Sequence, residues 1–110
     1  MAFHVVYSRH YWDYEDGNGT FANSWTIYKN VPYSELFKMK DAIPSLKENA
    51  DQVYADYESK KDYKVDPKQF HMSEVFIVDD EEYFWTYDDE FDNDGTPYSD
   101  KSYYHDYGQN

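Results

Sequence analysis

Two stretches near the N-terminus alternate apolar and polar positions in the way that β-strands do. In residues 3–14, one expected face carries Phe3, Val5, Tyr7 and Tyr11, and the other carries His4, Val6, Ser8, His10 and Trp12. Residues 20–29 resume the alternation, with Phe21, Trp25 and Ile27 on one side. Between them, residues 16–19 read Asp-Gly-Asn-Gly, a strong turn signal. The pattern predicts a β-hairpin over residues 3–29.

Residues 34–61 have helical periodicity instead. Ser34 is expected to cap a short helix that Pro44 ends, because proline lacks the backbone N–H that a helix interior needs. Ser45 and Glu48 then match a capping box, which begins a second helix running to about Lys61. The apolar stripe of this second helix recurs at steps of four, three and four residues, at Leu46, Ala50, Val53 and Tyr57.

A second hairpin is predicted over residues 73–87. Residues 73–79 are rich in branched and aromatic side chains, the run Asp80-Glu81-Glu82 is expected to turn, and residues 83–87 are expected to return as a strand. The order strand, strand, helix, helix, strand, strand predicts an α+β fold: a small antiparallel β-sheet from two hairpins, with a central helical segment packed on one face. Residues 1–88 would form this single core domain, followed by an acidic, tyrosine-containing C-terminal segment, 89–110.

Composition adds a strong charge asymmetry to this picture. The 110 residues have a net charge of −13, and 22% of them are aromatic, including 14 tyrosines. Residues 79–110 hold 11 acidic residues and only Lys101, whereas residues 1–78 are close to balanced. Such a high charge alone would favour disorder, but the aromatic side chains bring enough apolar area for a folded domain with an acidic surface.

The acidic residues are densest in residues 79–94, where nine carboxylates occupy sixteen positions without a basic residue. Fully extended, this run would carry one charge per ~6 Å of chain. Folded into a hairpin, it would approach the spacing of phosphates along one DNA strand, ~3.4 Å. The run therefore predicts a carboxylate array that occupies a lysine- and arginine-lined groove made for phosphates. The alternative is a solvated acidic face that only aids solubility.

Aromatic side chains lie among these carboxylates, at Tyr83, Phe84, Trp85, Tyr87 and Phe91. Tyrosine and tryptophan are enriched at interface hot spots, and arginine side chains stack on their rings. Part of this set must also pack in the sheet. The predicted partner-binding residues are Asp79, Asp80, Glu81, Glu82, Tyr83, Trp85, Tyr87, Asp88, Asp89, Glu90, Asp92 and Asp94.

Other chemistry finds little support. Glu90, Asp92, Asp94 and Gly95 fit the start of a calcium loop, but Lys101 stands where a glutamate is needed. His4 and His10 lie ~20 Å apart along a strand, too far to share a metal ion, and are expected to be surface or half-buried polar residues. The chain has no cysteine and none of the common catalytic or phosphate-binding motifs. We therefore expect no catalytic residues, no metal and no cofactor.

In size, charge and tyrosine content, the chain is similar to the loose functional class of phage DNA mimics, which inhibit CRISPR–Cas effectors, restriction enzymes or repair glycosylases. The expected function is a phage-type nucleic-acid mimic that occupies the basic surface of a host defence protein, first a Cas nuclease effector and second a restriction or repair enzyme. It would not bind nucleic acid itself, because a net charge of −13 repels phosphates.

Three other functions remain open, and a structural virion component is one of them. An immunity protein or antitoxin against a basic nuclease toxin would use the same electrostatics. A carbohydrate-binding module would use surface tryptophan and tyrosine rings with aspartate hydrogen bonds. The N-terminus reaches Arg9, His10 and Asp13 after a short apolar stretch, which argues against a signal peptide, an export signal or a membrane span. The expected location is the cytoplasm of a host bacterial cell.

Overall fold

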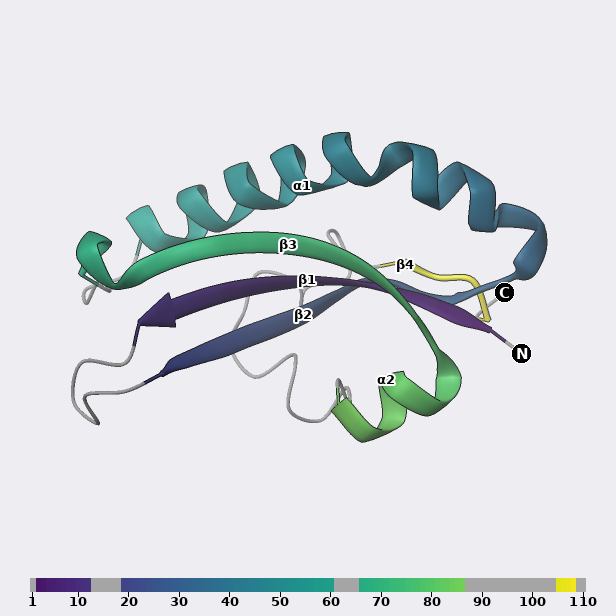
Figure 1. The fold of residues 1–110 in the computed structure, drawn as a ribbon. Helices are drawn as coiled ribbons and strands as arrows, with labels where there is room; N and C mark the ends of the chain where they lie inside the picture. Colours follow the sequence, from purple (N-terminus) through teal and green to yellow (C-terminus); the bar gives the residue numbers. More distant parts are fainter. Residues whose placement is uncertain (1, 13–18, 61–65, 87–104, 109–110) are drawn as a thin grey trace.

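The computed structural model describes residues 2–12, 19–60, 66–86 and 105–108. These form a four-stranded mixed sheet in the order β3-β1-β2-β4, with the long helix α1 on one face and the short helix α2 on the other (Figure 1). The elements in chain order are β1 (Phe3–Trp12), β2 (Thr20–Val31), the 3-10 turn η1 (Tyr33–Glu35), α1 (Leu36–Ser59), η2 (Pro67–Gln69), β3 (Phe70–Asp79), α2 (Asp80–Thr86) and β4 (His105–Asp106). The predicted α+β class is confirmed.

The first predicted hairpin is confirmed, with β1 and β2 antiparallel and Tyr7 opposite Trp25. The turn that joins them lies in residues 13–18, outside the described residues, apart from Gly19, whose φ of 113° favours glycine. At the far edge, β4 runs parallel to β2, with Tyr28 opposite His105, so the sheet is mixed. Residues 105–108 belong to the predicted C-terminal segment. The other residues of that segment, 89–104 and 109–110, lie outside the described residues.

The second predicted hairpin is wrong. β3 pairs antiparallel with β1, with Val75 opposite Tyr7, and residues 80–86 form the helix α2. Asp80, Glu81 and Glu82, expected as a turn, are the first turn of this helix. Carboxylates stabilise a helix N-terminus because they face the positive end of its dipole. Tyr83, Phe84 and Trp85 are residue types that prefer strands. The helix forms because the carboxylates favour a helix start and because the helix buries Tyr83.

The predicted break at Pro44 is also wrong, because α1 continues as one helix with Pro44 inside it. Ser45, expected to cap a second helix, donates its hydroxyl hydrogen bond to the Ala42 carbonyl, 3.0 Å away. An interior proline costs about 3 kcal/mol. Packing of Met39 and Ile43 before it, and Leu46 after it, against the same core offsets that cost.

The main core lies between α1 and the sheet. It contains the buried side chains Val5, Tyr7, Trp25, Ile27, Val31, Met39, Ala50, Tyr54 and Val75. The rings of Tyr7, Trp25 and Tyr54 stack in sequence, with centroids 5.4 and 5.0 Å apart. The predicted helical stripe is confirmed, since Ala50 is buried and Leu46, Val53 and Tyr57 pack against the core. Tyr54, which the stripe omitted, is buried more deeply than its neighbour Tyr57.

A smaller core lies on the opposite face of the sheet, under α2. It is formed by Val6, Val78 and Tyr83, with Phe76 packed against them. The central strand β1 is therefore covered on both faces, and Val5 and Val6, which point in opposite directions, are both fully buried. The predicted division of β1 into two faces is correct, and both faces belong to the interior.

A polar cluster connects α1 to the sheet beside the main core. Asp51 of α1 accepts hydrogen bonds from the hydroxyl groups of Tyr7 (2.5 Å) and Ser73 (2.7 Å) and from the Lys47 ammonium (2.9 Å). Partial burial acts to raise the pKa of Asp51, but these hydrogen bonds outweigh it and hold the pKa below its ordinary value. Burial raises the pKa of Tyr7, and its hydrogen bond to Asp51 adds to this, so the phenol stays a donor.

Asp51→Asn should lower the free energy of unfolding at neutral pH by about 2 kcal/mol, because charge-assisted hydrogen bonds from three donors are weakened. A carboxylate whose pKa is lowered by folding stabilises the protein above its unfolded pKa, ~3.9, and loses this contribution as the pH falls through the folded value. The difference between wild type and Asp51→Asn should therefore shrink as the pH falls below ~3.9.

Urea unfolding at pH 7 and pH 3 measures this difference. Glu48→Gln, an exposed change on the same helix, is the matched control and should stay within about 0.5 kcal/mol of wild type. An Asp51→Asn variant as stable as wild type at pH 7 would show that the cluster does not stabilise the fold.

Candidate protein-binding surface

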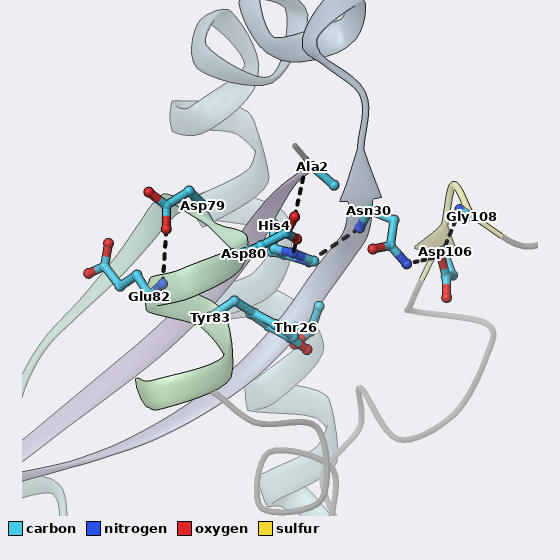
Figure 2. Close-up of polar contacts among 10 residues, drawn as sticks. All are labelled: Ala2, His4, Thr26, Asn30, Asp79, Asp80, Glu82, Tyr83, Asp106 and Gly108. Carbon is cyan, nitrogen blue, oxygen red and sulfur yellow. Dashed lines mark hydrogen bonds and ion pairs between the residues drawn. The ribbon is translucent and has the colours of Figure 1, made fainter.

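The predicted acidic run begins at the junction of β3 and α2. The Asp79 carboxylate accepts a hydrogen bond from the Glu82 backbone N–H, 2.9 Å away, as a helix cap does (Figure 2). Asp80, Glu81 and Glu82 follow in the first turn of α2. The sequence thus ends the strand and begins the helix at Asp79, whose carboxylate satisfies a backbone donor that the helix leaves unpaired.

Asp80 joins α2 to the N-terminal end of β1. It accepts hydrogen bonds from the Ala2 backbone N–H (3.0 Å) and from Nε2 of His4 (2.7 Å) (Figure 2). Nδ1 of His4 accepts from the Asn30 backbone N–H (3.2 Å), so Nε2 carries the proton that His4 donates. The Ala2 N–H and the His4 imidazole together hold the pKa of Asp80 below its ordinary value.

His4 is 1% exposed, so the expectation of a surface or half-buried histidine was wrong. Its ring stacks on the Tyr83 ring with centroids 4.0 Å apart. The Tyr83 hydroxyl reaches across to that of Thr26, 2.6 Å away, and Tyr83 is only 2% exposed. A buried histidine is stable here because both ring nitrogens have partners. Tyr83 is therefore part of the interior of the fold.

The exposed part of α2 combines acidic and aromatic side chains. Glu81 and Glu82 are exposed, Phe84 is 68% exposed, and Trp85 is 86% exposed. We call these four residues the α2 surface. Aromatic residues are enriched at protein interfaces, and here two large exposed rings lie beside two carboxylates on a helix that the buried Tyr83 holds against the sheet.

The structure thus divides the predicted site residues into three groups. Glu81, Glu82 and Trp85 lie on the α2 surface, while Asp79, Asp80 and Tyr83 hold α2 in place. The remaining predictions lie outside the described residues, at Tyr87, Asp88, Asp89, Glu90, Asp92 and Asp94. Phe84 is an addition, because strand alternation placed it on the face opposite Trp85, whereas the helix leaves both side chains exposed. Asp79 with Glu82 three residues later is the capping signal that indicates this helix.

The described residues contain no group of three or more His, Cys, Asp or Glu side chains placed to hold a metal ion. The partial calcium frame of residues 90–95, for which no metal is expected, lies outside them. None of the described helices is long and apolar enough to cross a membrane. Comparison of the chain with protein families, curated proteins and solved structures gave no significant match.

Two neighbouring substitutions separate the buried and exposed parts of α2. Tyr83→Ala should lower the free energy of unfolding by about 3–5 kcal/mol, because it removes a buried ring and leaves His4 unstacked. Trp85→Ala should change it by less than about 0.5 kcal/mol. Chemical denaturation of both variants measures the contrast, and similar losses in the two would contradict this division of α2.

Proposed function

We propose that this protein is an inhibitor that binds the basic nucleic-acid-binding surface of another protein, in the manner of a nucleic-acid mimic. The observation that carries the proposal is the pairing of charge and exposed aromatic area at one end of the chain. Residues 79–110 have 11 acidic residues against one lysine, and the start of this segment exposes Phe84 and Trp85 beside Glu81 and Glu82.

In this proposal, carboxylates take the place of phosphates in a groove lined by lysine and arginine. Charge of opposite sign attracts the partner over long range and speeds encounter. Phe84 and Trp85 then add apolar contact and faces on which arginine side chains stack. The first candidate partner is a Cas nuclease effector, whose guide and target channels are large and basic, and the second is a restriction or repair enzyme.

The first test is inhibition of purified nucleases by the purified protein. A combined Glu81→Gln, Glu82→Gln and Trp85→Ala variant should inhibit a susceptible nuclease about tenfold or more weakly than wild type, because it loses two charges and one aromatic anchor. Glu48→Gln, which removes an exposed charge from α1, is the matched control and should inhibit as wild type does. Equal inhibition by all three proteins would refute a role for the α2 surface.

The second test uses salt and competition. Replacing Asp88, Asp89, Glu90 and Asp92 by Asn or Gln should weaken binding to the inhibited nuclease and flatten its salt dependence, because fewer charges are screened. Excess nucleic-acid ligand should displace the protein from the nuclease. Salt-independent binding, or nucleic acid that binds the complex unimpeded, would contradict mimicry and leave the acidic run as a solvated surface.

A further inference from the structure

Two adjoining cavities flank Arg9, the only arginine of the chain, away from the α2 surface. Their volumes are about 380 and 430 Å³, and both are lined by Arg9, Asp51 and Phe70. They lie between the second half of α1 and the start of β3. Volumes of this size fall in the range of small-molecule sites.

Arg9 is held rigidly between the two cavities. Its guanidinium carbon lies 4.1 Å from the ring centroid of Tyr54 and 4.4 Å from that of Phe70. Nε donates to the Tyr11 hydroxyl (3.0 Å) and Nη1 to the Tyr7 hydroxyl (2.7 Å), with Asp51 3.6 Å from Nη1. Nη2 has no hydrogen-bond partner among the described residues. A fixed guanidinium edge with free N–H groups is suited to a carboxylate.

Acidic side chains line the same cavity as Arg9. Hydrogen bonds run from Arg9 to the Tyr11 hydroxyl and from there to the Tyr54 hydroxyl, 3.3 Å apart, and Tyr54 in turn bonds to Glu58. Glu58 and Asp66 both line the smaller cavity. Arg9 and Glu58 thus line the same cavity and are connected through the Tyr11 and Tyr54 hydroxyls.

The charged side chains that line the cavities favour some types of ligand over others. A phosphate or other dianion would meet Glu58, Asp66 and the negative field of the whole protein. A simple cation would meet Arg9, which stands at the wall of both cavities. A molecule with one negative and one positive end matches both groups. Ala55, Pro67 and Phe70 line the same cavity and offer an apolar wall for an uncharged body.

We propose that the cavities beside Arg9 bind a small zwitterion of the amino-acid type with an apolar side chain. Its carboxylate accepts hydrogen bonds from Nη2 of Arg9, its ammonium group faces Glu58 and Asp66, and its side chain lies against Pro67 and Phe70. This site is independent of the proposed inhibitory function, because it uses α1 and the opposite face of the sheet.

L-Phenylalanine is the probe, observed by amide NMR titration of the full chain. Saturable shifts are expected at Tyr11, Ala55 and Phe70. 2-Phenylethylamine, which lacks the carboxylate, and 3-phenylpropanoate, which lacks the ammonium group, should each bind at least about tenfold more weakly, because each loses one charged contact. Equal binding of the amine or of the acid would overturn the zwitterion assignment, and no saturable shift with phenylalanine would overturn the site.

Two variants at the cavity wall, outside the hydrophobic core, test where phenylalanine binds. Glu58→Gln should weaken phenylalanine binding by about fivefold or more through loss of the ammonium contact, and Ala55→Phe, at an exposed position, should fill the cavity and abolish it. Glu48→Gln is the control for Glu58→Gln and should bind as wild type.

The variant with the altered α2 surface should also bind phenylalanine normally, so failure of one proposal is distinguishable from failure of the other. Unchanged binding in Glu58→Gln and Ala55→Phe would place the ligand elsewhere.

Discussion

The structure depends on the central strand β1 being covered on both faces. Val5 contacts the core beneath α1, Val6 contacts the core beneath α2, and neither is accessible to water. With a net charge of −13, the chain must still place 23 acidic residues somewhere. A strand covered on two sides has no room for unpaired charge, because burying an isolated carboxylate costs several kcal/mol. The acidic residues that approach β1 are therefore those with specific partners.

Asp80 and Asp51 are two such carboxylates, on opposite faces of β1. Asp80 bonds to His4 and to the Ala2 backbone on the α2 face, and Asp51 bonds to Tyr7 and Ser73 on the α1 face. Both have a pKa held below the ordinary value, so both stay ionised at neutral pH. In each case an aspartate from a helix bonds to a polar side chain of the central strand. Apolar burial provides most of the stability, and these pairs fix where each helix sits.

The sequence predicted the parts of this fold that local pattern determines, and failed where distant contacts decide. Alternation identified β1 and β2, and helical spacing placed Ala50 and Leu46 on the core. The local cost of a proline predicts a helix end at Pro44, whereas the packing of Met39 and Ile43 on the sheet, which offsets that cost, does not show in a local pattern. Tyr83 looked like a strand residue and a partner contact. Its burial depends on His4, 79 positions earlier, and no local pattern reveals that pairing. Arg9 and Asp51 were missed for the same reason.

The geometry of β1 also separates the two sites proposed for this protein. His4 supports α2 on one face, and Arg9 lines the cavities on the other, five residues further along the strand. Five residues of antiparallel strand span ~17 Å, so the sites differ in both face and position. A partner that contacted only Glu81, Glu82 and Trp85 would therefore leave the cavity mouth open. Both sites contact β1 and β3, and because the packed side chains of these strands resist displacement, we expect little coupling between the two.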